Sequence, residues 1–342
     1  MGKPKIGIIN VTGYAGVELA RILLRHPGVA LTSVTGRSAA GQKLSSYFPH
    51  LVDTGLTIVA KLGVVDLAFS AMPHQESAAE IIPLFESGIK VVDISADFRL
   101  KNPADYDKWY GFTHPAHHLL KEAVFGLTEL YRSQVASARL VANPGCYPTG
   151  AILALAPAIK AGLIGTDIII DSKSGVSGSG RTLSLGTHYT EVNEDVAAYS
   201  LSGHRHLPEI TQELNFLRPG RSHMVTFVPH LIPMTRGILT TAYAPFTPGK
   251  IPSKEGLKKL YKEFYAGEQF VKISDTPPHT KHTWGSNLCI IYPVIDERTE
   301  RLIVISAIDN LVKGAAGQAI ENMNLMLGLP ETMGLEALPV YP

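Results

Sequence analysis

Short apolar runs alternate with helical patterns along the first part of the chain. Residues 5–10 form an apolar run that ends in a turn, and residues 16–25 then place apolar side chains on one helical face. A second helical pattern covers residues 75–87 and stops at Gly88. Strands that alternate with helices predict a parallel sheet covered on both faces, as in doubly wound α/β domains. Further strand patterns, rich in Val, Ile and Leu, cover residues 31–35, 67–71, 90–93 and 140–142.

The second part of the chain is rich in strands and has few crossover helices. Helical patterns flank this part at residues 151–161 and 316–327, and the polar residues 296–300 indicate the turn of a hairpin. We therefore expect a separate α+β domain with a mixed, largely antiparallel sheet. Its strand patterns cover residues 167–172, 223–229, 237–245, 268–273, 288–295 and 301–307.

Composition narrows the class of protein. At about 150 residues per domain, 342 residues suggest two domains. The net charge of +1 excludes a large basic surface for nucleic acid or anionic membrane, and 45% hydrophobic with 18% charged residues is typical of a compact globular protein. No segment approaches the ~20 apolar residues of a membrane span, and the first residues lack a secretory pattern. We expect a soluble, cytoplasmic enzyme.

The loop after the first strand resembles a dinucleotide-binding fingerprint. Asn10 stands where the first glycine of the fingerprint would be, and Gly13 and Gly16 keep the later glycine positions. Gly13 would allow close approach of a pyrophosphate, and Gly16 would allow the helix to pack close to the strand. Asparagine tolerates the left-handed conformation better than most residues. The alternative is a glycine-containing turn that binds no ligand.

The residues after the second strand favour NADP over NAD. An NAD site normally has Asp or Glu at this point, whereas this chain has Arg37 and Ser38. Arg37 can bind a 2′-phosphate with two hydrogen bonds, and Ser38 can donate another. The alternative for Arg37 is a solvated surface arginine.

Cys146 lies at a predicted junction between a strand and a helix, which is typical of a nucleophile. The partial positive charge at the helix N-terminus stabilises a thiolate, and backbone amides of the same turn could hold an oxyanion. The alternative is a small buried apolar residue. Cys289 lies inside an apolar strand pattern and is predicted to be an inert core residue. Two cysteines also make no disulfide framework.

A proton carrier for such a thiol is offered by the histidine pair His204 and His206, which flank Arg205. Histidine titrates nearest to neutral pH, so we predict acid/base and substrate-binding roles here. A structural role and a metal pair are the alternatives. No further Cys, His or carboxylate set with metal-ligand spacing accompanies them, so we predict no metal.

Six sequence strings together resemble the N-acetyl-γ-glutamyl-phosphate reductases, a family of acyl-phosphate reductases of arginine biosynthesis. Asn10 is the departure from the pattern, and it concerns how tightly the first turn approaches a pyrophosphate. The strings run from near the first residue to near the last, so the resemblance covers essentially the whole chain. They are GYAG at 13–16, SADFRL at 95–100, NPGCYPT at 143–149, GHRH at 203–206, PHLIPMTRG at 229–237 and DNLVKGAAG at 309–317.

The resemblance implies a reaction that these residues can carry. The Cys146 thiolate would attack the γ-carbonyl of N-acetyl-γ-glutamyl phosphate, phosphate would leave to give a thioester, and NADPH would reduce the thioester to the semialdehyde. His204 or His206 would accept the thiol proton and protonate the alkoxide. We favour His204 for this role, with His206 shaping the site.

The resemblance also implies the organisation of the chain and its binding residues. A Rossmann-like NADP-binding domain would comprise residues 1–145 and 313–342, and a catalytic and oligomerisation domain residues 146–312, in a homo-oligomer, either a dimer or a tetramer. The anionic substrate would bind at Arg99, Asn143, Ser174, Arg205 and Arg236. The coenzyme would bind at Gly13, Tyr14, Ala15, Gly16, Arg37, Ser38, Ser70, Pro73, Ser177, Gly178, Asn310, Lys313 and Gly314.

Two other functions are compatible with parts of this pattern. A reductase of aspartyl phosphate or of carrier-linked aminoadipyl phosphate would use the same cysteine chemistry. The NPGCYPT string and the tandem histidines fit the glutamyl enzyme better. An NADP-binding redox sensor without turnover would be expected to lack an acid/base partner, yet both His204 and His206 are present.

Overall fold

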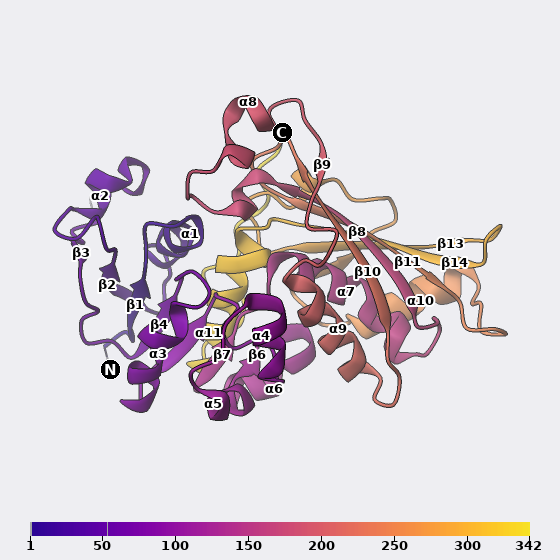
Figure 1. The fold of residues 1–342 in the computed structure, drawn as a ribbon, viewed down its shortest axis with the longest axis horizontal. Coiled ribbons are helices and arrows are strands. Elements are labelled where there is room, and N and C mark those ends of the chain that lie inside the picture. Colours follow the sequence, from indigo (N-terminus) through magenta and orange to yellow (C-terminus); the bar gives the residue numbers. More distant parts are fainter. Residues whose placement is uncertain (1, 53) are drawn as a thin grey trace. The chain divides into compact units, whose positions relative to one another are not determined.

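The computed structural model of the chain describes residues 2–52 and 54–342, and it divides them into two compact units (Figure 1). The first unit runs up to Gly145 and also includes Ala315–Ala337, and the second comprises Cys146–Gly314 and Leu338–Pro342. The last five residues therefore lie in the second unit, where the Val340 N–H donates to the Trp284 carbonyl at 2.8 Å. The domain ranges expected from the sequence had placed them, with residues 313 and 314, in the first.

The first unit is built on a seven-stranded sheet in the order β3-β2-β1-β4-β5-β7-β6. Every strand pair that the structure describes in this sheet is parallel. This confirms the predicted doubly wound α/β class. The strands are β1 (Lys5–Ile9), β2 (Ala30–Thr35), β3 (Ile58–Val59), β4 (Leu67–Ser70), β5 (Lys90–Asp93), β6 (Val124–Phe125) and β7 (Leu140–Ala142).

Helices cover both faces of this sheet. All four residues of the central strand β4 are therefore buried, although their side chains alternate between the two faces. One apolar core joins side chains of α3, α4 and α5 to the strands, and α11 packs against α6, α1 and β5. The helices are α1 (Tyr14–Leu23), α2 (Leu44–Tyr47), α3 (Ser77–Glu86), α4 (Ala104–Tyr110), α5 (His117–Glu122), α6 (Thr128–Ser137) and α11 (Gly317–Met326), with a 3-10 turn at Pro49–Leu51.

The strand order reverses beside β1, whose two neighbours are β2 and β4. The connections that follow β1 and β4 therefore diverge at their carboxyl ends, which is where open α/β sheets bind ligands. The loops at residues 10–13 and 71–76 are thereby identified as the candidate ligand site of the first unit.

The second unit is built on a mixed seven-stranded sheet in the order β12-β13-β14-β11-β8-β10-β9. Among the strands that the structure describes, β8 with β10 and β12 with β13 are parallel and the other neighbours are antiparallel, as predicted. The strands are β8 (Asp167–Gly175), β9 (Ala197–Ala198), β10 (Met224–Ile232), β11 (Ile238–Pro245), β12 (Val271–Ile273), β13 (Cys289–Asp296) and β14 (Arg301–Ile308).

The helix α7 (Cys146–Lys160) packs on this sheet and carries two further helices, α9 (His206–Leu217) and α10 (Lys254–Phe264). Pro157 lacks the N–H that would bond to the Leu153 carbonyl four residues earlier in α7. The Tyr265 hydroxyl donates to that carbonyl instead, at 2.5 Å. A buried tyrosine thus satisfies the carbonyl that the proline leaves without its helical partner. Shorter elements are α8 (Tyr189–Val192), 3-10 turns at Val176–Ser179, Leu185–Thr187 and Thr280–His282, and a π turn at Val312–Ala316.

Candidate active site and coenzyme loops

The loop after β1 is shaped by Asn10, which adopts the left-handed conformation with φ 62°. Its side-chain amide donates to the Ala71 carbonyl at 2.9 Å, and its side-chain oxygen accepts from the Thr12 hydroxyl at 3.1 Å. Asn10 therefore meets the backbone requirement that the first glycine of the fingerprint would meet, and it also ties the loop after β1 to the loop after β4.

The two glycines of this loop have different surroundings. A Cβ at Gly16 would lie 2.4 Å from the Asn10 carbonyl oxygen, so only glycine fits where α1 passes the strand end. A Cβ at Gly13 would meet no atom closer than 3.9 Å, so packing does not require glycine there. Gly13 also caps α1 without a side-chain hydrogen bond. The first amides of α1, at Tyr14 and Ala15, can therefore serve an anion such as a pyrophosphate.

Arg37 and Ser38 are exposed just beyond β2. The Arg37 guanidinium forms an ion pair with Glu76, which precedes α3 on the loop after β4. No sequence pattern indicates Glu76 as a partner of Arg37, because the two lie 39 positions apart in the chain and only the fold brings them together.

Ser70 and Pro73 lie on the loop side of β4 in contrasting environments. The Ser70 hydroxyl is fully buried and lies 2.6 Å from that of Ser77, which donates to Asp93 at 2.7 Å. Pro73 is exposed. The structure therefore leaves Pro73, and not the Ser70 hydroxyl, accessible to a coenzyme.

Arg99 and Asn143 are buried, and their polar groups bond within the first unit. Arg99 donates to the carbonyls of Ile94 at 2.7 Å and Asn143 at 2.8 Å. The Asn143 amide donates to the Ala315 carbonyl at 3.2 Å, and its oxygen accepts from Asn322 at 3.1 Å. Arg99 thus supplies donors to the carbonyls that follow β5 and β7, and the substrate contacts at Arg99 and Asn143 stay predictions.

In the second unit, Cys146 is the first residue of α7 and is partly exposed. A Cβ at Gly314 would lie 2.8 Å from the Cys146 Cβ, so Gly314 leaves room for the cysteine. Cys289 is fully buried on β13. Cys146 is thus the accessible thiol of the two.

A cluster of rings surrounds His204 and reaches the residue beside Cys146. The His204 ring centroid lies 4.8 Å from that of His206 and 5.4 Å from that of Phe227. The Tyr147 ring lies 5.6 Å from His204 and 5.8 Å from His206. Because Tyr147 follows Cys146 in the chain and contacts both histidines, the structure brings the three predicted catalytic residues into one neighbourhood.

His204 is held in its neutral form. The His206 backbone N–H donates to His204 Nδ1 at 3.1 Å, which assigns the ring proton to Nε2. Burial and, to a smaller extent, the positive charge of Arg205 lower the pKa of His204 to about 4. At neutral pH His204 is therefore a hydrogen-bond donor with little capacity to take up a proton.

Two tyrosine hydroxyls complete this cluster. The hydroxyls of Tyr147 and Tyr199 lie 3.0 Å apart, and Tyr147 also donates to the His230 carbonyl at 3.3 Å. Burial raises the pKa of Tyr199 to about 12 and raises that of Tyr147 as well, so both phenols stay protonated. Tyr199 lies in a polar segment where no periodicity or motif distinguishes it in the sequence.

The small-residue loop after β8 rests on the turn that precedes β11. A Cβ at Gly175 would lie 2.8 Å from the Thr235 carbonyl oxygen, which explains the glycine. Asn310 links this loop and the turn, because its amide donates to the Ser177 hydroxyl at 2.9 Å and its oxygen accepts from the Gly237 N–H at 2.7 Å. A Cβ at Gly178 would lie 3.1 Å from the Ser174 hydroxyl, so these predicted residues lie together in the second unit.

The charged side chains predicted for this unit have different environments. Arg236 is 30% exposed and lies 3.5 Å from the fully buried Asp309. Arg205 is exposed between the two histidines. Lys313 is completely buried, with its Nζ 5.5 Å from the Phe270 ring centroid. This burial argues against a coenzyme contact through the Lys313 ammonium group.

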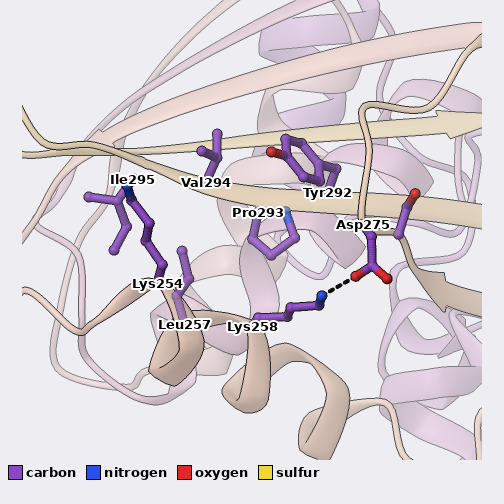
Figure 2. A pocket seen from close by; sticks show the side chains of 9 residues that line it. Lys254, Leu257, Lys258, Asp275, Tyr292, Pro293, Val294 and Ile295 are labelled. Atoms are coloured by element: carbon purple, nitrogen blue, oxygen red, sulfur yellow. Dashed lines mark ion pairs between the residues drawn. The ribbon is translucent and has the colours of Figure 1, made fainter.

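A separate pocket of the second unit lies between α10 and β13 (Figure 2). Its lysines pair with carboxylates, Lys254 with Glu297 and Lys258 with Asp275. It contains none of the predicted site residues, so we assign it no ligand. In the part of the chain that the structure describes, no three His, Cys, Asp or Glu side chains gather as metal ligands, and no helix is long and apolar enough to cross a membrane.

Comparison with known proteins matches each of the two units to its own family model. Residues 5–138 match the family model described as semialdehyde dehydrogenase, NAD binding domain, and residues 146–310 match semialdehyde dehydrogenase, dimerisation domain. The fold resembles aspartate semialdehyde dehydrogenase II of Vibrio cholerae, with a TM-score of 0.70 at 16% identity over 96% of this chain and 99% of that one. It also resembles the Candida albicans aspartate semialdehyde dehydrogenase solved with NADP, with a TM-score of 0.67 at 16% identity over 97% and 100% of the two chains.

With these two domains, the chain is an oxidoreductase of the semialdehyde dehydrogenase class. The relatives named N-acetyl-gamma-glutamyl-phosphate reductase from Dehalococcoides mccartyi strain BAV1 and Symbiobacterium thermophilum are 60% and 49% identical, over 100% and 99% of both chains respectively. The chain belongs to this N-acetyl-gamma-glutamyl-phosphate reductase family. The resemblance inferred from the six strings is confirmed.

Proposed function

We propose that this chain catalyses the NADPH-dependent reductive dephosphorylation of N-acetyl-γ-glutamyl phosphate to N-acetylglutamate semialdehyde, a step of arginine biosynthesis. The observation that carries the proposal is Cys146 at the first position of α7, followed by Tyr147, whose ring contacts both histidines. The names of the full-length relatives support the choice of the glutamyl substrate over aspartyl or aminoadipyl phosphates.

The chemistry begins with the Cys146 thiolate, which the positive end of α7 favours. The thiolate attacks the γ-carbonyl carbon, and the carbon–oxygen bond to phosphate breaks to leave a thioester. NADPH, when bound, supplies the hydride that reduces this thioester. The resulting alkoxide expels the Cys146 sulfur as the aldehyde forms, and the thiolate is regenerated.

The two histidines have separate roles in this proposal. With a pKa of about 4, His204 is protonated in about one molecule in a thousand at pH 7, too few for an acid catalyst. Its Nε2–H instead donates a hydrogen bond to the developing oxyanion. His206, at the first position of α9, takes up the thiol proton. We therefore propose His206 as the proton carrier, in place of His204, which the sequence favoured.

The remaining residues of the candidate site are assigned to substrate and coenzyme groups. Arg205 and Arg236 are the cations for the phosphate and the α-carboxylate. Ser174, near the end of β8, is a further predicted substrate contact. The coenzyme pyrophosphate binds at residues 13–16, where Gly13 leaves the backbone uncovered and no capping side chain occupies the first amides of α1. Arg37 and Ser38 receive the 2′-phosphate. Pro73 in the first unit is a further predicted coenzyme contact. Ser177, Gly178, Asn310 and Gly314 in the second unit also stay predicted coenzyme contacts.

We also propose that the protein is a homo-oligomer formed through the second unit. Alternate residues of β11 and β14 are buried under α7, whereas Leu239, Tyr243, Ile303 and Ile305 point the other way and are partly exposed. Such an apolar sheet face is typical of an interface. The name of the matching family model, dimerisation domain, supports this reading.

The test runs the reaction in reverse. Phosphate-dependent reduction of NADP⁺ by N-acetylglutamate semialdehyde should occur with the wild type and be lost in Cys146→Ser. Cys289→Ala removes the other thiol and should keep the activity of the wild type. Turnover of aspartate semialdehyde with no activity on N-acetylglutamate semialdehyde would contradict the proposed substrate.

A further inference from the structure

Glu76 forms an ion pair with the Arg37 guanidinium, the group predicted to bind the 2′-phosphate of the coenzyme. Arg37 follows β2 and Glu76 precedes α3, and their side chains form an ion pair while remaining 70% and 42% exposed. A ligand arriving from solvent can therefore reach both charges. An anion that binds Arg37 there must do so in the presence of the Glu76 carboxylate.

The backbone around Glu76 is anchored on both sides. The buried Asp97 carboxylate accepts from the Gln75 N–H at 2.8 Å and from the Ala78 N–H at 2.9 Å. Gln75 adopts a left-handed φ of 72°, and its side-chain amide donates to the Tyr110 carbonyl at 2.7 Å. These bonds fix the direction in which Glu76 leaves the loop, so its carboxylate is directed at Arg37 by the fold.

The two residues before Arg37 contact the loop after β1. A Cβ at Gly36 would lie 3.0 Å from the Thr12 methyl group, and the Val11 N–H donates to the Thr35 carbonyl at 2.8 Å. Gly36, directly before Arg37, therefore packs closely against the loop assigned to the pyrophosphate. An adenosine ribose bound next to this loop would therefore meet both members of the ion pair.

We propose that Glu76 sets the preference of this enzyme between NADPH and NADH, an inference that rests on the coenzyme site of the proposed function. The carboxylate repels a 2′-phosphate and competes with it for the Arg37 guanidinium. The same carboxylate accepts a hydrogen bond from the 2′-hydroxyl of NADH, as acidic residues do in NAD sites. Both effects make the preference for NADPH over NADH smaller than it would be with Arg37 alone.

The test measures binding of two fragments, adenosine 2′,5′-bisphosphate and 5′-AMP, by calorimetry on the purified full-length protein. Glu76→Gln keeps the shape of the side chain and removes its charge. The affinity ratio of the bisphosphate over 5′-AMP should rise by about 3- to 10-fold, the size expected when one exposed charge interaction is removed. The ratio of Kd values for NADPH and NADH, followed by their fluorescence, should shift in the same direction.

Glu80→Gln is the matched control, because Glu80 is an exposed carboxylate on the first turn of the same helix. Its affinity ratio should equal that of the wild type. An unchanged ratio in Glu76→Gln, or an equal rise in Glu80→Gln, overturns the inference while the proposed function stands. A wild type that binds the bisphosphate no better than 5′-AMP overturns the NADP assignment itself, so the two failures are distinguishable.

Discussion

Gly314→Ala should slow catalysis by displacing the nucleophile. The new Cβ would lie 2.8 Å from the Cys146 Cβ and 3.2 Å from its Cα, whereas ordinary contacts of this kind begin near 3.4 Å. The two backbones must separate by about 0.6 Å in a tightly packed turn, and overpacking of this kind costs about 1–3 kcal/mol of stability. Because a 1 Å misplacement of a reacting group costs about 100-fold, kcat should fall by about 10- to 100-fold.

The assay for Gly314→Ala is the steady-state reduction of NADP⁺ together with the rate of Cys146 alkylation by iodoacetamide. Both rates should fall, while binding of adenosine 2′,5′-bisphosphate in the first unit stays unchanged. Gly186→Ala is the control, because a Cβ there meets no atom within 4 Å. A Gly314→Ala enzyme with kcat within twofold of the wild type would refute the argument that Gly314 makes room for Cys146.

Three further outcomes follow from single contacts. Gly16→Ala places a Cβ 2.4 Å from the Asn10 carbonyl oxygen, so NADPH affinity measured by fluorescence should fall at least about tenfold while alkylation of Cys146 is unchanged. Tyr265→Phe removes the donor to the buried Leu153 carbonyl and should lower the free energy of unfolding in urea by about 1–3 kcal/mol. Burial lowers the pKa of His114 to about 4 in the folded state, so the unfolded state binds the extra proton and stability falls as the pH drops from 7 through 4. The wild type should lose about 2 kcal/mol more than His114→Gln between pH 7 and pH 5 in urea unfolding, and equal losses would refute the burial argument.

Hydrophobic periodicity predicted most strands of the two sheets, because the burial of a strand is visible in the order of its own apolar and polar residues. The β strands of the parallel sheet are buried apolar runs, and β11 alternates buried and partly exposed residues along its length. The two-residue strands β3 and β6 lie at the sheet edges and are too short to carry a pattern. The helix α10 was missed although Leu257 and Tyr261 mark its buried face at helical spacing.

The candidate site was predictable where the chain itself brings the groups together. Cys146 was identified from the tight turn that precedes a helix, and His204 and His206 are neighbours in sequence. Glu76 and Tyr199 escaped notice because only tertiary structure places them beside Arg37 and Tyr147.

For two predicted site residues, the fold adds a constraint that residue type alone does not show. Arg99 has the chemistry of an anion-binding residue, yet its guanidinium donates to buried carbonyl groups. Lys313 likewise carries a cation that its burial keeps from solvent. Residue type shows which bonds a side chain can make, and the fold decides which partners it meets.

Covalent capture of the substrate on Cys146 would demonstrate the proposed thioester itself. The protein is mixed with N-acetyl-γ-glutamyl phosphate in the absence of coenzyme, quenched in acid and examined by intact and peptide mass spectrometry. We predict one N-acetylglutamyl thioester on Cys146, formed together with one equivalent of phosphate, and none in Cys146→Ala. Release of phosphate without an adduct, or an adduct that persists in Cys146→Ala, would exclude Cys146 as the nucleophile that accepts the acyl group.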